Sequence, residues 1–331
     1  MERFALAAAV VLGFALTAAL CSLFVPLRRV LERREQNQQP VQSEQPRPAP
    51  LRAPLWGGLC AAAGTVAAVG VGWLAACVGQ PELLGSEGRL MTRLLTALAG
   101  SLAFGAVGLA EDLARMRSPA ALGLRRDVRL LLEALAAAFV LLLLQAAGCL
   151  PRGLDVPGAG YVLLGSAVPF LWAVLMVVLA ECARIAERDE GTVCGAAFVA
   201  MLALMMAEAG LGVPGLAVLP AALAGALVAL LLWAFPPARL GVGCCGSLLA
   251  AGAIGCIPLS LDMTSLTVPL ALPFWAAGGL LAAQLLGTKR TGKPLRCWVK
   301  KHKMSPETVF LCSFALSAVG YVLALALLRW C

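Results

Sequence analysis

The chain has 331 residues, of which 61% are hydrophobic and only 13% are charged. Soluble globular domains carry roughly 25% charged residues, so this composition excludes an ordinary soluble protein and indicates an integral membrane protein. The net charge of +8 does not call for a nucleic-acid partner, because basic cytoplasmic loops beside anionic lipid account for it. Few loops are long enough to form a soluble domain, so we expect one polytopic membrane domain over residues 1–331.

Ten segments are long and apolar enough to cross a bilayer as helices, which takes about 20 residues each. The sequence therefore predicts an all-α fold of about ten transmembrane helices. In chain order they cover approximately residues 4–27, 55–78, 91–110, 128–149, 160–181, 192–210, 213–234, 246–261, 267–287 and 308–329.

The basic residues predict the orientation of these helices. Most of the 26 Lys and Arg residues fall in the connections that follow the odd-numbered segments. Cytoplasmic loops are the ones enriched in Lys and Arg, so both termini are predicted to lie outside. The first apolar run could be a signal peptide, but Arg28 and Arg29 follow it without a small-residue cleavage pattern, which favours an uncleaved span.

The twelve cysteines do not indicate a disulfide framework or a zinc site. Most lie inside apolar segments, where cysteine behaves as a small hydrophobic residue. The sequence has no CxxC pair, and its only histidine is His302.

Ionisable residues gather at the cytoplasmic ends of two predicted spans. The third span ends in Glu111 and Asp112, and the fifth ends near Glu181. Beyond it, Glu187 and Glu190 are three residues apart, which puts them on one side of a continuing helix. Such carboxylates could hold Mg²⁺ against a diphosphate. The alternative is a solvated surface of self-paired charges. Nearby, Glu133 could simply pair with Arg126 or Arg129, also without a functional role.

Several short motifs occur in the order typical of one enzyme family. A polar, proline-rich stretch at residues 36–54 leads into Trp56-Gly57-Gly58, and Gly108 to Asp112 ends in paired acids. A helix-end motif follows at 184–191, a loop at 237–247, and a Thr-Gly-Lys segment begins at residue 291. The chain resembles the polyprenyl-phosphate N-acetylhexosamine-1-phosphate transferases, and most closely their phospho-N-acetylmuramoyl-pentapeptide transferase branch.

This resemblance implies a reaction and a location. The phosphate of undecaprenyl phosphate attacks a UDP-linked muramoyl-pentapeptide and releases UMP, with Mg²⁺ as cofactor, at the cytoplasmic side of the bacterial inner membrane. Polyprenyl phosphate and a UDP-sugar are the implied ligands; a second copy of the chain and other envelope-synthesis proteins are further candidate partners. The implied catalytic positions are Glu111, Asp112 and Cys244; the metal positions are Asp112, Glu187 and Glu190; the substrate-binding positions are Arg129, Arg184, Gly246, Ser247 and Arg296.

Departures from the family pattern fall on the same positions. Cys244 replaces an aspartate, and a thiol is mostly protonated at neutral pH and a poor ligand for Mg²⁺. Arg184 replaces an asparagine and is spaced to pair with Glu187. Glutamates replace aspartates at three positions, and Arg296-Cys297-Trp298 stands where the pentapeptide transferases have three histidines. We therefore expect a family member with impaired catalysis.

Two alternatives remain open. The first is an active phosphoglycosyl transferase with a magnesium site rebuilt from Glu111, Asp112, Glu187 and Glu190. The second is a transporter or channel, although the sequence shows no paired Gly/Pro-broken segments in two similar halves.

Overall fold

The computed structural model describes residues 2–38, 56–79, 88–117, 123–156, 160–163, 165–187, 191–213, 215–236, 238–286 and 305–330. Helices dominate this part of the chain. The elements are α1 (Glu2–Gln38), α2 (Gly57–Gly79), α4 (Gly88–Arg117), α5 (Arg126–Ala146), β1 (Gly153–Val156), β2 (Gly160–Leu163), α6 (Ala167–Ala186), α7 (Thr192–Gly210), α8 (Val218–Ala234), α9 (Gly243–Ser260), the 3-10 helix η1 (Thr264–Leu266), α10 (Thr267–Leu270), α11 (Leu272–Leu286) and α13 (Pro306–Trp330).

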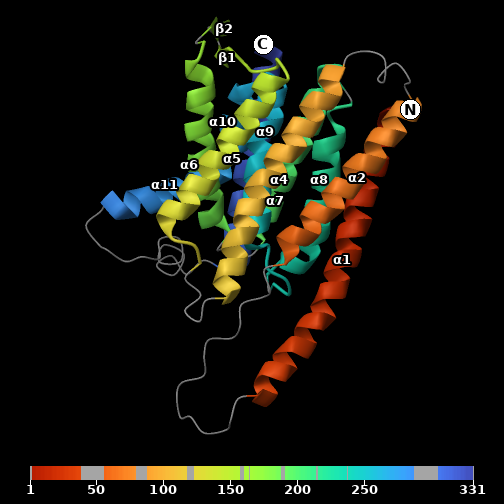
Figure 1. The fold of residues 1–331 in the computed structure, drawn as a ribbon, viewed down its shortest axis with the longest axis vertical. Helices are drawn as coiled ribbons and strands as arrows, with labels where there is room; N and C mark the ends of the chain where they lie inside the picture. Colours follow the sequence, from red (N-terminus) through yellow and green to blue (C-terminus); the bar gives the residue numbers. More distant parts are fainter. Residues whose placement is uncertain are drawn as a thin grey trace.

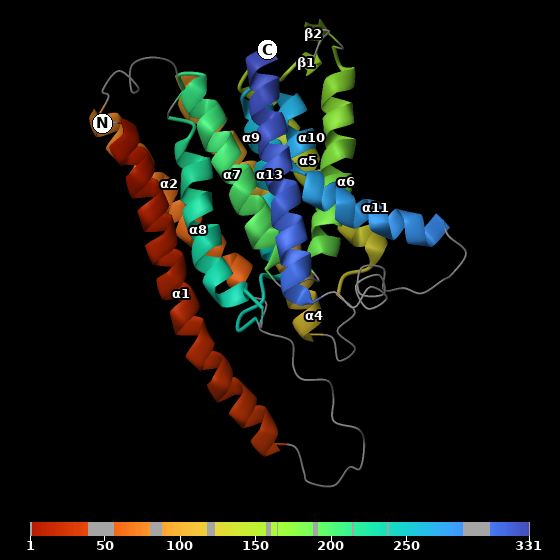
Figure 2. The same ribbon diagram turned by 180° about the vertical axis from the view of Figure 1, so that it is seen from behind.

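The long helices run side by side in a bundle, as Figures 1 and 2 show from opposite sides. Within the described residues, seven helices are long and apolar enough to cross a membrane, and α8 is a shorter apolar helix of 17 residues. The chain is a multi-pass membrane protein, which confirms the predicted class. Both termini lie at the same end of the bundle (Figure 1). That this end faces the outside stays a prediction.

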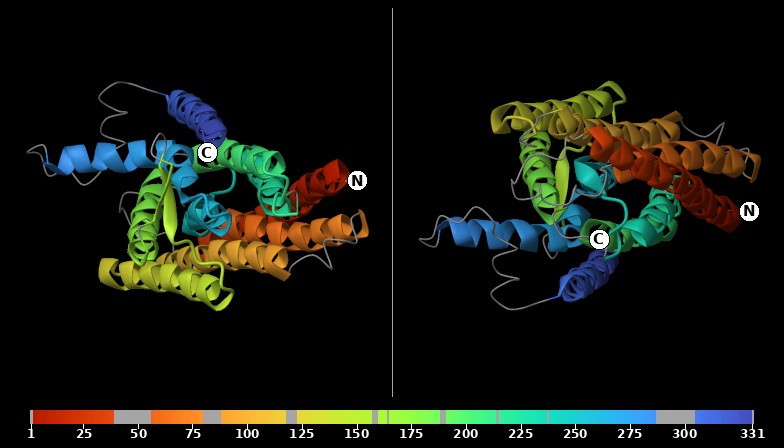
Figure 3. Two further views of the ribbon diagram at one scale, coloured as in Figure 1. Left: turned by 90° about the horizontal axis from the view of Figure 1, so that it is seen from above. Right: turned by 90° about the horizontal axis from the view of Figure 1, so that it is seen from below.

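Helix α9 occupies the centre of the bundle, and all of its residues are buried. It packs against α4 most extensively, and also against α2, α6 and α7, so that other helices surround it when the bundle is viewed along its axis (Figure 3). Its sequence explains this position, because Gly, Ala, Cys and Ser make up much of the helix. Small side chains let neighbouring helices approach closely within a membrane.

Residues 160–181 do not form the single helix that hydropathy predicted. Residues 160–163 are strand β2, which pairs with β1 in an antiparallel hairpin with Gly153 opposite Leu163. The helix begins only at Ala167 and continues to Ala186. Gly160 and Gly165 adopt positive φ angles of 73° and 59°, a conformation that favours glycine and interrupts a helix. The hairpin lies at the same end of the bundle as the termini (Figure 1).

The predicted span at 267–287 is also broken. Its residues form the short helix α10 and then α11, and Figure 1 shows α11 lying across the direction of the other helices. Pro269 and Pro273 explain the interruption, because a proline lacks the N–H that a continuous helix needs. Pro273 falls in the first turn of α11, where that missing donor is tolerated.

Candidate functional site

The side chain of Asp112, near the end of α4, holds the beginning of α9. Its Oδ1 accepts the backbone N–H of Cys244 at 3.0 Å, and its Oδ2 accepts that of Cys245 at 2.9 Å. The first amides of a helix have no partner within the helix, and they carry a partial positive charge. Asp112 therefore caps α9 from a different helix. Its side chain is almost completely buried.

Glycines let three backbones meet around this cap. A methyl group at Gly108 would collide with the carbonyl group of Cys244, and one at Gly58 would collide with the backbone of Gly246. The amides of Gly57 and Gly58 donate to the carbonyl groups of Gly241 and Val242, at 3.2 and 2.9 Å. The beginning of α2 and the end of α4 thus fix the segment that carries Cys244.

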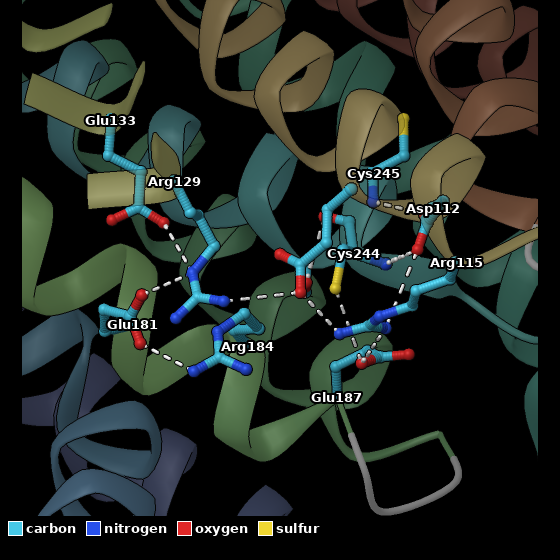
Figure 4. Close-up of polar contacts among 11 residues, drawn as sticks. Asp112, Arg115, Arg129, Glu133, Glu181, Arg184, Glu187, Cys244 and Cys245 are labelled. Carbon is cyan, nitrogen blue, oxygen red and sulfur yellow. Dashed lines mark hydrogen bonds and ion pairs between the residues drawn. The ribbon is translucent and has the colours of Figure 1, made fainter. Parts of the chain in front are cut away.

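Arg115 is the centre of a first group of charges, together with Glu111, Asp112 and Glu187. Its Nη2 lies 2.7 Å from Oε1 of Glu111, and its Nη1 lies 3.8 Å from Oδ1 of Asp112 and 3.8 Å from Oε2 of Glu187. The thiol of Cys244 contacts Oε2 of Glu187 at 3.8 Å (Figure 4). We call these four charged residues the Arg115 group; it joins α4 to the end of α6.

Glu181 is the centre of a second group, which joins α5 to α6. Its Oε1 accepts from Nε of Arg129 at 2.7 Å, and its Oε2 accepts from Nη2 of Arg184 at 2.7 Å (Figure 4). Glu133 lies 4.0 Å from Nε of Arg129, as one of the two sequence alternatives predicted. We call these four residues the Glu181 group. Arg129 also lies 3.6 Å from Glu111, so the two groups are in contact.

The structure brings most of the predicted site residues together. The predicted catalytic residues Glu111, Asp112 and Cys244 adjoin the predicted metal ligand Glu187. Arg129 and Arg184 lie in the neighbouring Glu181 group. Helix α6 ends at Ala186 with Glu187 at its C-cap, so the helix does not continue as expected. Glu190 and Arg296 lie outside the described residues.

Gly246 and Ser247 were predicted to bind substrate, and both are buried within α9. Gly246 packs against Gly58, and the hydroxyl of Ser247 donates to the carbonyl oxygen of Cys244 at 3.1 Å. Through these contacts, both residues stabilise the packing at the beginning of α9. Their role in substrate binding stays a prediction.

The alternative of self-paired charges is partly right. The acidic residues are paired with arginines, but they are not solvated, since Glu111 and Asp112 are each only 2% exposed. Arg184 was expected to pair with Glu187, and its short ion pair is instead with Glu181, three residues earlier. Two central residues, Arg115 and Glu181, had no role in the predicted site. Their spacing of three and four residues from Glu111, Asp112 and Arg184 was the available signal.

The described residues do not fit a magnesium ion. Mg²⁺ requires oxygen ligands in near-ideal octahedral geometry. Both oxygens of Asp112 accept helix amides, Oε1 of Glu111 pairs with Arg115, and position 244 offers sulfur. Among the residues described, no group of three or more His, Cys, Asp or Glu side chains could hold a metal ion.

The central buried helix α9 and the acidic ends of α4 and α6 lie in the part of the chain that matches a known family of membrane transferases. The sequence pattern of glycosyl transferase family 4 matches residues 94–262, which include every residue of both charged groups. The chain belongs to this family.

Individual relatives agree with this assignment. The chain is similar to the phospho-N-acetylmuramoyl-pentapeptide-transferase of Mycobacterium tuberculosis (strain ATCC 25618 / H37Rv), with 28% identity over 265 residues, 72% of each chain. The protein of that name from Desulforudis audaxviator is 34% identical over 170 residues, 48% of this chain and 50% of that one. The one from Synechococcus sp. (strain RCC307) is 32% identical over 215 residues, 63% and 55% respectively. The predicted family of peptidoglycan-synthesis membrane transferases is thereby confirmed.

Proposed function

We propose that this chain keeps the fold of its family but does not catalyse the magnesium-dependent transfer of a phospho-sugar. It acts instead as a lipid- or nucleotide-binding partner in envelope synthesis, in the bacterial cytoplasmic membrane. The observation that carries the proposal is Cys244. Its side chain is fully buried and contacts Glu187, at the position where the family pattern has an aspartate. A buried neutral thiol supplies neither a fixed negative charge nor a hard ligand for Mg²⁺.

The contacts of Asp112 support the same conclusion. A carboxylate that activates a lipid phosphate or binds a metal must direct a free lone pair at that group. Each oxygen of Asp112 already accepts an amide of α9. Withdrawing the carboxylate from these amides would leave the beginning of a buried helix without acceptors, which is costly.

The proposed ligands follow from the resemblance: a polyprenyl phosphate and a UDP-sugar. Arginine suits phosphate because its planar guanidinium offers several donors. Arg129 and Arg184 lie at the Glu181 group with small exposed fractions, 8% and 13% of their side chains. We also propose a second copy of the chain or another envelope-synthesis protein as a partner.

A release assay for UMP tests the proposal directly. The purified chain is given undecaprenyl phosphate, a UDP-linked muramoyl-pentapeptide and Mg²⁺, with an active transferase of the family as the positive control. We expect no magnesium-dependent UMP from the native chain. The Cys244→Asp variant, assayed in parallel, shows whether this one position accounts for the loss. Robust turnover by the native chain would refute the proposal.

A second candidate function is an active transferase whose rebuilt site uses Glu111, Asp112, Glu187 and Glu190. One observation favours it: Oε2 of Glu111 is buried and has no hydrogen-bond partner among the described residues, so it could serve as a ligand or a base. If the native chain releases UMP, Glu187→Gln and Glu190→Gln should each abolish that release. Activity that survives both changes would rule out this site.

A further inference from the structure

Helices α1 and α2 pack against each other along a seam of small residues, and they lie side by side at the margin of the bundle (Figures 1 and 2). The contacts that define the seam are Ala9 with Gly72, Thr17 with Gly64, and the stacked rings of Phe24 and Trp56. A methyl group added at Gly64 would collide with the side chain of Thr17, so the two backbones are close there. Each step toward higher residue numbers on α1 matches an equal step toward lower numbers on α2, so the register is antiparallel.

This register places two cysteines opposite each other. Cys21 lies four residues after Thr17, and Cys60 lies four residues before Gly64. Both side chains are buried free thiols, and a hydrogen bond joins them. A disulfide bond needs Cα atoms about 4.4–6.8 Å apart, and small residues in a helix–helix seam allow such an approach.

Two other buried cysteines lie near this pair. Cys194 of α7 interacts electrostatically with Cys21, and Cys245 of α9 interacts electrostatically with Cys60. The hydrogen bond between the thiols distinguishes the pair formed by Cys21 and Cys60 from these two contacts. Cys21 and Cys60 are therefore the cysteines best placed to join.

A groove of about 480 Å³ lies beside the pair, between α1 and α2. Its lining includes Leu20 and Ser22, the chain neighbours of Cys21. Leu16 and Leu23 also line it, and they are 37% and 67% exposed on the surface of a helix that is apolar enough to span the membrane. The groove therefore gives a small apolar molecule in the bilayer a route toward the two thiols that a charged, water-soluble molecule lacks.

We propose that Cys21 and Cys60 form a reversible disulfide bond between α1 and α2, with a quinone dissolved in the bilayer as the oxidant. The S–S bond forms as both S–H bonds break, and the two protons and two electrons pass to the quinone, which becomes a quinol. A dithiol reductant reverses the reaction by thiol–disulfide exchange. The inference does not depend on the proposed function, because neither cysteine belongs to the two charged groups.

The bond would act on the candidate site through the first turn of α2. Cys60 lies in that turn, and its amide donates to the carbonyl oxygen of Trp56 at 3.1 Å. In the same turn, the amides of Gly57 and Gly58 hold the segment that leads into Cys244. Oxidation would therefore tie α1 to the turn that supports the beginning of α9.

The experiment exposes the full-length chain in phosphatidylcholine vesicles to duroquinone, whose ring is fully substituted and so resists addition of a thiol. Free thiols are counted after denaturation, and unreduced peptides are identified by mass spectrometry. The native chain should fall from twelve to ten free thiols, yield a peptide that links Cys21 to Cys60, and recover all twelve in dithiothreitol. Its unfolding temperature should rise by several degrees on oxidation, because the bond closes a loop in the unfolded chain.

Single variants assign the bond. Cys21→Ala and Cys60→Ala should each keep all eleven remaining thiols in duroquinone. The matched control is Cys77→Ala, which removes a buried cysteine near the opposite end of α2 and should still lose two thiols. Oxidised glutathione, which stays in the water, should not produce the linked peptide.

Three results would overturn the inference. The first is a native chain that keeps twelve free thiols in duroquinone, and the second is a loss of thiols without the linked peptide. The third is a bond from Cys21 to Cys194 in place of Cys60. If oxidised glutathione forms the linked peptide as fast as duroquinone does, the route from the bilayer is wrong.

Discussion

The Arg115 group and the Glu181 group are built from the same kinds of side chain, but their geometry differs. In the Glu181 group, one carboxylate receives two guanidinium donors at 2.7 Å, each on a separate oxygen. In the Arg115 group, one guanidinium has a single contact of 2.7 Å and two of 3.8 Å. The first arrangement is a tight clamp between α5 and α6. The second is a looser cluster around one cation, at the place where the family pattern expects the chemistry.

This difference distinguishes side chains that short contacts hold in place from side chains that longer contacts leave room to move. Short, charge-assisted hydrogen bonds fix side chains firmly, and longer ion pairs leave room for change. In the Arg115 group, the firm contacts are those of Asp112 to the backbone of α9 and the hydrogen bond from Arg115 to Glu111. The fold therefore holds Cys244 through the backbone, while Glu187 lies 3.8 Å from both Arg115 and the thiol of Cys244.

The largest effect should follow removal of the cap on α9. Asp112→Ala deprives two buried amides of their acceptor and should lower the free energy of unfolding by about 3 kcal/mol. Asp112→Asn retains one acceptor oxygen and should lose about half as much. Thermal unfolding in detergent measures both, with Asp127→Asn at an exposed site on α5 as the control. Equal stability of all three variants would contradict the capping role.

An intermediate effect should follow disturbance of the backbone contact beneath the Arg115 group. In Gly58→Ala, the added methyl group meets the backbone of Gly246 and should cost about 2 kcal/mol. Gly70 lies on the same helix and has open space around it, so Gly70→Ala should be neutral or slightly stabilising. Cysteine accessibility at Cys244, measured with a small thiol reagent, should rise only in the Gly58 variant.

The smallest effect should come from the Glu181 group, because its central side chain is 23% exposed. Glu181→Gln weakens both arginine contacts and should lower the free energy of unfolding by about 1.5 kcal/mol. Combining it with Arg184→Met should cost less than the sum of the single changes, since the pair is coupled. Additive costs in this double-mutant cycle would show that the clamp contributes nothing as a pair.

Much of the site was predictable because its residues lie at helix ends. The order of the motifs along the chain placed Asp112, Glu187 and Cys244 at one end of the bundle, and the structure brings them together. The pairing of Arg184 could not be predicted from spacing alone. Glu181 and Glu187 are both three residues from it, and the choice depends on Arg129, which reaches Glu181 from α5.

Two of the predicted transmembrane segments were wrong for local physical reasons. Hydropathy reports how apolar a segment is, and it does not report whether glycines or prolines interrupt it. Residues 160–165 are apolar enough to extend a span, yet their positive-φ glycines form a hairpin and a turn. Residues 267–287 are equally apolar, and Pro269 and Pro273 divide them. The transporter alternative remains a prediction that the vesicle uptake of solutes would test.

The burial of α9 has a consequence for the depth of Cys244 in the membrane. Ordinary spanning helices settle where their apolar length matches the thickness of the surrounding lipid. Helix α9 has no such direct anchor, because every one of its residues is covered by protein. The depth of α9 in the membrane is set by α2, through the close contact at Gly58, and by α4, through the cap that Asp112 provides. A thicker or thinner bilayer should therefore shift Cys244 only as far as those two outer neighbours tilt.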